Sequence, residues 1–201
     1  MSETPGNREI ILEQALALFS ARGYEAVSVQ ELVNASGVTK PTLYYYFGSK
    51  EGVYEALLAR HYERLDNALS AVARYVPRPS EYFADIYPVL LRLTLCYFKF
   101  ALADEAFYRL ALANLFLPPS SSLQAATRKH HFRQYDICEA MFESMGAAHG
   151  NLRGKKKLLA WTYIGLVNAF IGLRFSAMDS LELNEETARE LVRRFMHGIY
   201  S

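Results

Sequence analysis

The sequence predicts an all-α fold of about nine helices. Strand signals are scarce, because no Asn-Gly or Asp-Gly turn joins alternating apolar runs. The 11 glycines and 7 prolines fall instead at intervals that separate helical patterns. Hydrophobic residues make up 51% of the 201 residues and charged residues 21%, which is typical of a folded globular chain and excludes a disordered or fibrous one. The net charge of +1 indicates no class of partner.

Three short helices are predicted before residue 50. The first covers residues 7–22 and ends at Gly23. The second begins at residues 28–31, a Ser-x-x-Glu capping box in which the hydroxyl and the carboxylate satisfy free backbone donors, and it ends near Ala35. Gly37 turns the chain. The third helix covers residues 39–46, with a threonine as its cap, and it tolerates a proline in its first turn because no intrahelical donor is needed there.

Longer helices are predicted after residue 48. Glycines and prolines separate most of them, and the helix after residue 80 is expected to bend at Pro88. The predicted ranges are 49–75, 80–103, 104–116, 121–145, 155–178 and 184 to the end of the chain. Three short helices followed by longer ones indicate two domains, which we place at residues 6–65 and 66–201.

The helix predicted over residues 155–178 contains a stretch without charge, residues 158–173. A membrane span needs about 20 apolar residues. This stretch is shorter and contains Asn168, so we interpret it as a helix buried against protein. Small side chains recur on one face, where a second helix could approach closely, and with the last helix this face would form half of a four-helix interface in a homodimer. The expected interface residues are Thr162, Gly165, Ala169, Gly172, Leu191 and Phe195. The alternative, in which both helices are buried within a monomer, stays open.

Residues 28–47 are the most informative segment. A short helix, a tight turn at Gly37 and a second short helix form a helix-turn-helix, whose second helix enters the major groove of DNA. Short or flexible side chains at the start of that helix allow its N–H groups to approach a phosphate. The tyrosines at positions 44–46 can pack on sugars and donate their hydroxyls to phosphate oxygens. Double-stranded DNA is therefore the expected partner.

This segment resembles the DNA-binding segment of the TetR family of transcriptional regulators. The resemblance rests on Ser28-Val29-Gln30-Glu31-Leu32 through Gly37-Val38-Thr39-Lys40-Pro41-Thr42-Leu43-Tyr44-Tyr45-Tyr46-Phe47-Gly48-Ser49-Lys50-Glu51. Ala17-Leu18-Phe19 and Gly23-Tyr24 resemble the first helix of the family. The resemblance covers about residues 6–65, and the remainder is similar only in being helical and of suitable length.

The resemblance implies a three-helix DNA-binding domain over residues 6–65 and a larger helical domain for effector binding and dimerisation over 66–201. It further implies a homodimer on a near-palindromic operator and a repressor that a small molecule releases. The residues expected to contact DNA are Ser28, Thr39, Lys40, Pro41, Thr42, Tyr44, Tyr45, Tyr46 and Lys50. Among them Lys40 is the best candidate to read a base, since lysine can donate to guanine. Thr39 could instead be only a cap, one tyrosine could pack inward, and Leu43 and Phe47 are expected in the core.

The charge of the first 50 residues does not favour tight DNA binding. Four basic residues stand against five acidic ones, namely Arg8, Arg22, Lys40 and Lys50 against Glu3, Glu9, Glu13, Glu25 and Glu31. Because non-specific affinity depends on neutralising phosphates, we expect weak binding to arbitrary DNA and a shallow dependence on salt.

Aromatic residues are concentrated between positions 82 and 116, where they form either a plain core or an effector pocket. Several tyrosine hydroxyls there would need partners if buried, and the resemblance implies a pocket. The pocket residues expected are Phe83, Tyr87, Thr94, Tyr97, Phe98, Phe107, Phe116 and Asn168, the last of which could equally fix the dimer interface. Such a pocket would be largely uncharged and would suit a small hydrophobic effector.

Three function classes are compared. The first is a homodimeric repressor released by a small effector, and the second is a TetR-like DNA-binding protein controlled by a protein partner or organising DNA, without a ligand. The third is a helical enzyme, against which the sequence has no Ser-His-carboxylate set, no paired carboxylates and no Gly-rich phosphate loop.

The basic cluster around residues 128–133 is interpreted as solvated surface. Since His130, His131 and His149 lack metal-ligand spacing, neither a metal nor a cofactor is expected. Only Cys96 and Cys138 occur, and residues 1–7 lack the apolar core of a secretory signal, so the expected location is the cytoplasm without membrane contact.

Overall fold

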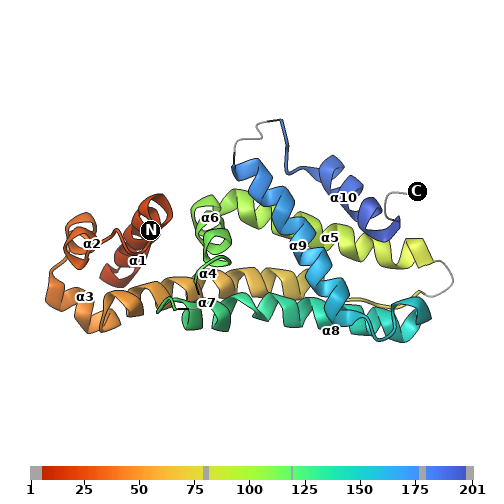
Figure 1. The fold of residues 1–201 in the computed structure, drawn as a ribbon, viewed down its shortest axis with the longest axis horizontal. Helices are drawn as coiled ribbons and strands as arrows, with labels where there is room; N and C mark the ends of the chain where they lie inside the picture. The colour runs from red at the N-terminus through yellow and green to blue at the C-terminus, as the bar shows by residue number, and fades with distance from the viewer. Residues whose placement is uncertain (1–5, 79–81, 119, 177–179, 198–201) are drawn as a thin grey trace. The chain divides into compact units, whose positions relative to one another are not determined.

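The structure, a computed structural model, describes residues 6–78, 82–118, 120–176 and 180–197. Helices are the only regular secondary structure in these four ranges (Figure 1). They form ten α-helices and one 3-10 turn: α1 Asn7–Arg22, α2 Val29–Ser36, α3 Lys40–Phe47, α4 Lys50–Val72, α5 Tyr82–Ala103, α6 Glu105–Asn114, α7 Gln124–His131, α8 Arg133–Ala148, η1 Gly150–Leu152, α9 Lys156–Phe175 and α10 Glu185–His197. The all-α prediction is confirmed.

Most helix ends lie within a few residues of the predicted ends, because local chemistry sets them. Gly23 follows α1 at φ 77° and Gly37 follows α2 at φ 64°, a left-handed backbone that glycine adopts without steric cost. The start of α10 is capped by Asn184, whose Oδ1 accepts from the Thr187 N–H at 2.9 Å. Pro88 lies inside α5.

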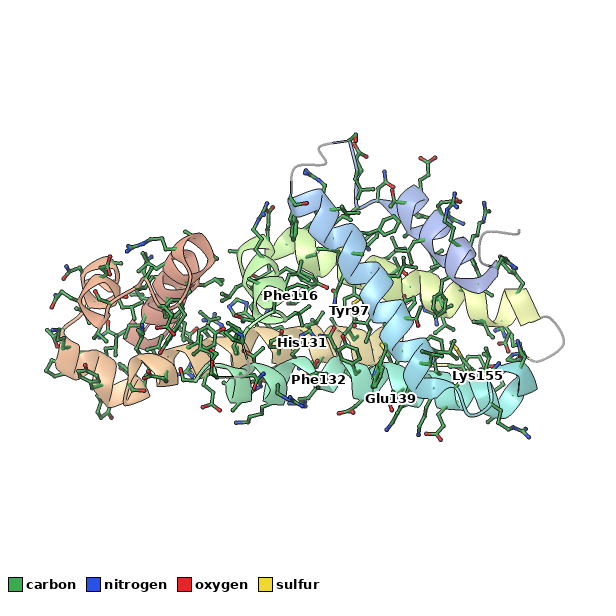
Figure 2. All side chains as sticks on the ribbon, in the orientation of Figure 1. Tyr97, Phe116, His131, Phe132, Glu139 and Lys155 are labelled. Carbon is green, nitrogen blue, oxygen red and sulfur yellow. The ribbon has the colours of Figure 1, made fainter. Side chains whose placement is uncertain are left out.

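The helix predicted over residues 121–145 is two helices, α7 and α8, which are separated at Phe132. No glycine or proline marks this break. Its cause is tertiary, because the last residues of α7 are held in a buried site. His131 Nδ1 lies 2.9 Å from the hydroxyl of Tyr62 on α4 (Figure 2 labels His131 and Phe132). The interpretation of this cluster as solvated surface was wrong for His130 and His131, which are both buried.

The chain divides into two compact units, and the division falls within α4 and at the α7–α8 break. The first unit comprises Met1–Glu63 and Ala106–His131, and the second comprises Arg64–Glu105 and Phe132–Ser201. The first unit thus joins the three N-terminal helices to the α6–α7 segment, which the sequence assigned to the second domain. The functional boundary at residue 65 stays a prediction.

Each unit has its own aromatic core. In the first, the rings of Phe19, Tyr24 and Tyr54 lie 5.1–5.7 Å apart. In the second, Tyr163 of α9 packs on Phe195 of α10 with ring centroids 5.3 Å apart. Such aromatic pairs stabilise a core beyond the apolar area that they bury.

The second unit also contains a buried polar cluster at Asp85. One oxygen of this carboxylate accepts from the Tyr75 hydroxyl and lies within hydrogen-bond distance of His149 Nε2, both at 2.6 Å, and the other accepts from the Arg78 N–H at 2.9 Å. Tyr75 and Arg78 lie in the connection between α4 and α5, and His149 directly follows α8. The cluster therefore links this connection to the end of α8.

Candidate nucleic-acid interface

Residues 28–47 fold as a helix, a turn at Gly37 and a second helix. Gly37 donates from its N–H to the carbonyls of Val33 and Asn34, which ends α2. Thr39 then caps α3, since its Oγ1 accepts from the Thr42 N–H at 3.4 Å and lies 2.9 Å from the Thr42 hydroxyl. The predicted capping role of Thr39 is confirmed, and its hydroxyl is already engaged within the helix start.

Helix α3 presents its side chains in two sets. Leu43 is fully buried and fixes the helix to its own domain. Lys40 and Pro41 are exposed at its start, and all three tyrosines are exposed, Tyr45 by 83%. Exposed large aromatic side chains in a row mark a surface with a partner more often than a bare surface. The alternative that one tyrosine packs inward does not hold, and Phe47, expected in the core, is only half-buried.

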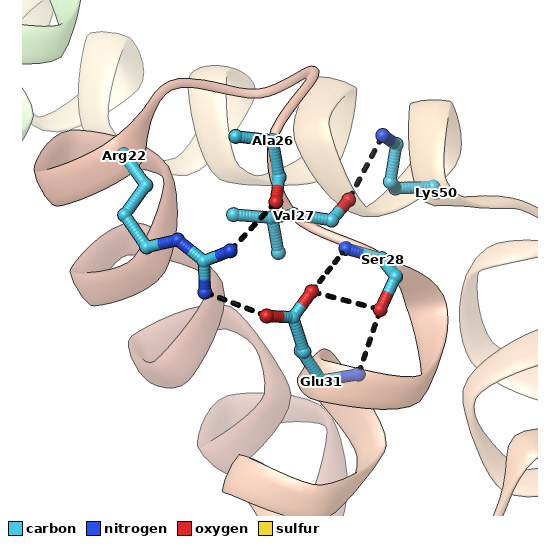
Figure 3. A network of polar contacts seen from close by, with 6 residues as sticks. All are labelled: Arg22, Ala26, Val27, Ser28, Glu31 and Lys50. Carbon is cyan, nitrogen blue, oxygen red and sulfur yellow. Dashed lines mark hydrogen bonds and ion pairs between the residues drawn. The ribbon is translucent and has the colours of Figure 1, made fainter.

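The start of α2 is held by a polar network that extends to α1 (Figure 3). Glu31 Oε2 accepts from the Ser28 N–H and from the Ser28 hydroxyl, both at 2.8 Å, and Ser28 Oγ accepts from the Glu31 N–H at 3.2 Å. This is the predicted capping box. The guanidinium of Arg22 donates to Glu31 Oε1 at 2.6 Å and to the Ala26 carbonyl at 2.8 Å. These bonds, the one from the Ser28 backbone first, lower the pKa of Glu31 from 4.5 to about 2.

The structure gives Lys50 a role that differs from the expected phosphate contact. Its ammonium donates to the carbonyls of Tyr24 at 3.1 Å and of Val27 at 3.0 Å (Figure 3 shows the second bond). It also lies 3.9 Å from the centre of the Tyr24 ring, a cation–π contact. Two of its three donors therefore stabilise the α1–α2 turn and position the helix-turn-helix, and the expected phosphate contact of Lys50 stays a prediction.

Gly52 is a residue that the sequence analysis did not single out. A Cβ atom at this position would lie 1.9 Å from the carbonyl oxygen of Phe47. The close approach lets Ser49 cap α4, with its Oγ accepting from the Gly52 N–H at 3.0 Å. Glycine is required here by contact with backbone rather than by its own dihedral angles. The only sequence signal for this role of Gly52 is a glycine three residues after a serine.

The pocket residues expected from the sequence fall in both compact units. Phe107 and Phe116 belong to the first unit, and the other six belong to the second. Phe107 is in the core of the first unit, stacked on His61 at 4.7 Å, and Phe116 is 88% exposed (Figure 2). Phe107 therefore fits the core alternative, and the pocket role of Phe116 stays a prediction.

The remaining expected pocket residues lie mostly in the core of the second unit. Thr94 Oγ1 bonds to the Leu90 carbonyl at 3.0 Å and lies 2.8 Å from the Tyr163 hydroxyl, and the Tyr97 hydroxyl donates to Gln134 Oε1 at 3.0 Å. Because these hydroxyls have partners inside the protein, they fit the core alternative. Tyr87 and Phe98 are buried, Phe83 is exposed and stacked on Tyr87, and Asn168 is half-buried.

The expected interface residues divide by helix. On α9, Thr162, Gly165 and Ala169 are exposed and Gly172 is half-buried. On α10, Leu191 is fully buried and Phe195 contacts the rings of Tyr163 and Phe142. Leu191 is thus part of the protomer's own core, whereas Phe195 is half-buried and its place in an interface stays a prediction.

The cysteines and acidic or imidazole groups form no apparent metal site or reactive pair. Within the described residues no cluster of three such groups has the arrangement of a metal site. Cys96 and Cys138 are free thiols, and burial raises the pKa of Cys138 to about 12, so this thiol stays protonated and inert.

A family comparison matches the N-terminal segment. Residues 11–57 match the sequence model of the bacterial regulatory proteins of the tetR family. The repressor ComR of Escherichia coli is 45% identical over 58 residues, which cover 29% of this chain and 28% of ComR. The activator FasR of Mycolicibacterium smegmatis is 34% identical over 104 residues, which cover 52% of this chain and 44% of FasR. The chain thus spans less than half the length of these two relatives.

Solved structures extend the likeness of fold to the whole chain. FadR of Bacillus halodurans, a fatty acid degradation regulator, has a TM-score of 0.79 at 15% identity, with 99% of each chain covered. PfmR of Thermus thermophilus, a TetR family regulator, has a TM-score of 0.73 at 24% identity, covering 98% of this chain and all of PfmR. FadR of Bacillus subtilis, solved with stearoyl-CoA, has a TM-score of 0.76 at 14% identity, with 96% of this chain and 99% of that FadR covered.

The chain thus combines an N-terminal helix-turn-helix with a larger helical region. Residues 11–57 carry the sequence pattern of the TetR family of transcriptional regulators, and the whole chain shares its fold with solved structures that include a TetR family regulator. Its relatives are regulators and not enzymes.

Proposed function

We propose that this protein is a sequence-specific DNA-binding regulator of transcription whose α3 lies in the major groove. The observation that carries the proposal is the exposed face of α3, where Lys40 and the three tyrosines stand free of the core while Leu43 anchors the helix. Lysine can donate to guanine O6 and N7, and tyrosine hydroxyls suit phosphate oxygens. A DNA-binding role places the protein in the cytoplasm.

We propose repression as the mode of regulation. ComR and the IcaR regulator of Staphylococcus aureus are named as repressor and negative regulator, whereas FasR is named as an activator. A bound dimer that covers an operator blocks other proteins without needing a further activity, so repression is the simpler mode for a chain with these elements.

We propose a homodimer that binds a near-palindromic operator through two copies of α3. The support is the surface of α9, where Trp161 is 56% exposed and Leu158 and Leu173 are also exposed beside the small residues Gly165 and Ala169. Helices α5 and α9 are long and apolar enough to cross a membrane by length and composition, and 28% of the most apolar stretch of α9 is buried. Asn168 in the middle of α9 favours a second protein helix as its cover over lipid, because polar side chains are costly within a membrane span.

We propose that a small, largely hydrophobic effector releases the protein from DNA. The support is the presence of cavities of about 470 Å³ in the second unit and 550 Å³ in the first, each lined mainly by apolar side chains. These volumes lie within the range of small-molecule sites. The neighbour from Bacillus subtilis was solved with stearoyl-CoA, a molecule with a long apolar chain.

The test begins with selection of bound fragments from genomic DNA, which yields the operator. Operator affinity is then measured for the wild type and for Lys40→Ala and Tyr45→Phe. We expect an inverted repeat among the selected fragments, relaxed specificity at one base pair of each half-site for Lys40→Ala, and uniformly weaker binding for Tyr45→Phe. Fragments without a common sequence would contradict the proposal and would favour a protein that organises DNA.

A further inference from the structure

A cavity of about 550 Å³ lies within the first unit. One wall comes from the end of α1 and the turn that follows it, including Phe19 and Tyr24. The other comes from α6 and the segment after it, including Leu110, Ala113 and Asn114. All of its lining residues belong to the compact unit that also contains the helix-turn-helix.

The charged groups that line the cavity are engaged elsewhere, so they do not require a charged occupant. Arg22 donates to Glu31 at 2.6 Å and to the Ala26 carbonyl at 2.8 Å (Figure 3). Arg109 also has an interaction partner within the protein, and both Arg109 and Glu25 are exposed to water. The lining side chains that are buried are uncharged, and they are Phe19, Tyr24, Leu110, Asn114 and Leu123. The interior therefore suits an uncharged and mainly apolar molecule.

Asn114 is the amide among these buried side chains. Only 7% of it is exposed, and its Nδ2 makes no hydrogen bond within the protein. The hydroxyls of Tyr54 and Thr127, in the same unit, are also buried without a hydrogen bond. Burial raises the pKa of Tyr54, and the nearby side chains of Thr127 and Asn114 oppose that rise, which indicates that the three groups lie together. Since buried polar atoms are nearly always hydrogen-bonded, this cluster has capacity for a polar atom from outside the chain.

Of these three side chains, Asn114 is the one that lines the cavity. An asparagine amide has two N–H donors and an acceptor oxygen, so its proximity to the Tyr54 hydroxyl leaves a donor for an occupant. A carbonyl oxygen is a matching acceptor. The apolar body of such an occupant would pack against Phe19, Leu110 and Leu123.

We propose that this cavity binds a small uncharged molecule with an apolar body and a carbonyl oxygen, which accepts a hydrogen bond from Asn114 Nδ2. The proposal names the site and the chemical class of the effector, so its effect on DNA rests on the proposed function, whereas the binding does not. The cavity wall includes the α1–α2 turn, which Arg22 bonds at the Ala26 carbonyl and Lys50 bonds at the Tyr24 carbonyl. An occupant thus contacts the turn that positions α2, and this gives it a route to change operator affinity.

The chemical class is tested with prodan, an uncharged naphthalene ketone whose fluorescence shifts to the blue when it leaves water, titrated into the full-length protein. A matched hydrocarbon, in which a methylene group replaces the carbonyl, competes with it. For the wild type we expect the dissociation constant of the hydrocarbon to be at least about fivefold higher. Asn114→Leu keeps the volume and removes the amide, so it should bind the two molecules alike. Equal binding of both by the wild type would overturn the proposal.

The location is tested by filling the cavity. Ala113 is exposed and lines it, so Ala113→Trp adds an indole there without replacing a core side chain. Ala68→Trp is the matched control, because Ala68 lines the separate cavity of the second unit. We expect the dissociation constant of prodan to rise at least about tenfold in Ala113→Trp and to be unchanged in Ala68→Trp. Equal binding by the wild type and Ala113→Trp, or loss confined to Ala68→Trp, would overturn the site.

Thermal unfolding without a probe separates a ligand contact of Asn114 from a structural one. An amide that serves an occupant can be replaced by leucine without loss, so the melting temperature of Asn114→Leu should equal or exceed that of the wild type. A clearly lower melting temperature would show that the amide supports the fold instead, and would overturn its assigned role. Ser121→Trp, which also lines the cavity, replaces Ala113→Trp if that variant is not folded.

The effect on DNA is measured separately on the selected operator. We expect saturating prodan to weaken operator binding at least about fivefold for the wild type and not for Ala113→Trp. Unchanged operator affinity with the site occupied would overturn the effector role of the cavity, whereas failure to find an operator would count against the proposed function alone.

Discussion

Lys40 and Lys50 carry the same charge but stand in opposite environments. Lys50 is held by two carbonyls and the Tyr24 ring, so its charge is used inside the domain. Lys40 is exposed in the first turn of α3, a turn without an acidic residue. A cation at a helix N-terminus is opposed by the helix dipole. The position of Lys40 is therefore better explained by contact with a negatively charged partner than by a contribution to the stability of the fold.

Exchanging each lysine should separate stability from DNA binding. We expect Lys50→Met to lower the free energy of unfolding by about 1–3 kcal/mol, because it removes charge-assisted hydrogen bonds to a turn. We expect Lys40→Ala to change the free energy of unfolding by less than about 0.5 kcal/mol. For a contact of Lys40 with phosphate, the variant should also reduce the slope of the logarithm of the operator association constant against the logarithm of the salt concentration by about 1 per chain. Urea unfolding and operator titrations at several salt concentrations measure both effects. A Lys40→Ala protein with unchanged operator affinity would remove this residue from the interface.

Glu31 gives the fold a specific dependence on pH. Its folded-state pKa of about 2 lies below the ordinary 4.5, so its stabilising bonds are fully present above about pH 4.5. They are lost as the pH falls from there toward about pH 2. In Glu31→Gln this contribution is absent at every pH.

We therefore expect the melting temperature of the wild type to exceed that of Glu31→Gln most clearly above about pH 5. The difference should narrow as the solution is acidified. Circular dichroism melts of both proteins, taken down to the pH at which the wild type unfolds, give this difference directly. A gap that stays constant with pH would show that the carboxylate is not held by the Ser28 and Arg22 bonds.

The local features of single residues could be predicted from the sequence, because caps and turns depend on neighbours in the chain. The box at Ser28 and Glu31 and the cap at Thr39 are formed as expected. Burial of His131 and the engagement of Lys50 could not be predicted. Their partners, Tyr62 and Tyr24, are 69 and 26 residues away, and no local pattern relates them.

At the scale of elements, Gly52 sets how closely α4 follows α3. Alanine is normally favoured over glycine in a helix by about 1 kcal/mol. At this position its Cβ would lie 1.9 Å from the Phe47 carbonyl oxygen, so the backbone of one helix must move. We expect Gly52→Ala to destabilise the protein by about 1–3 kcal/mol and to weaken operator binding by displacing the end of α3.

Gly150→Ala in η1 is the matched control, because a Cβ there meets nothing within 4 Å and Gly150 lies outside α3, α4 and α9. Urea unfolding of the two variants at equal protein concentration measures the contrast. A Gly52→Ala protein as stable as the wild type would mean that the α3–α4 junction yields to the added methyl group.

The predicted elements were least accurate where tertiary contacts override local sequence. The α7–α8 break has no glycine or proline, and it lies where the chain passes from one compact unit to the other. The choice between core and pocket could not be made from the sequence for a related reason. Helical spacing placed Thr94 and Tyr97 on one face, but it could not show that their hydroxyls bond to Tyr163 and Gln134.

At the scale of the whole molecule, the charge of the DNA-binding helices limits what one chain can do alone. Of the four basic residues before residue 51, Arg8, Arg22 and Lys50 are engaged within the unit. Few cations remain to neutralise phosphates, so binding to arbitrary DNA should be weak. Two chains on one operator double every contact, which makes dimerisation a requirement for useful affinity.

The exposed face of α9 is where we expect this dimer to form. Ala169 lies among the small exposed residues of that face. In a two-fold interface each substitution occurs twice, near its own copy. Ala169→Glu therefore places two like charges in an apolar contact, where desolvation adds to repulsion. We expect its dimer dissociation constant to rise at least about a hundredfold, with a parallel loss of operator affinity.

Asn67→Glu, on an exposed position of α4, is the control, because it adds the same charge away from α9 and should leave both quantities unchanged. Sedimentation velocity over a range of concentrations gives the oligomeric state of all three proteins. Because α10 contributes its apolar residues Leu191 and Val192 to the protomer's own core, the interface must draw its apolar area chiefly from α9. A single charge there should suffice to separate the chains, and an Ala169→Glu protein that stays dimeric would place the interface on another surface.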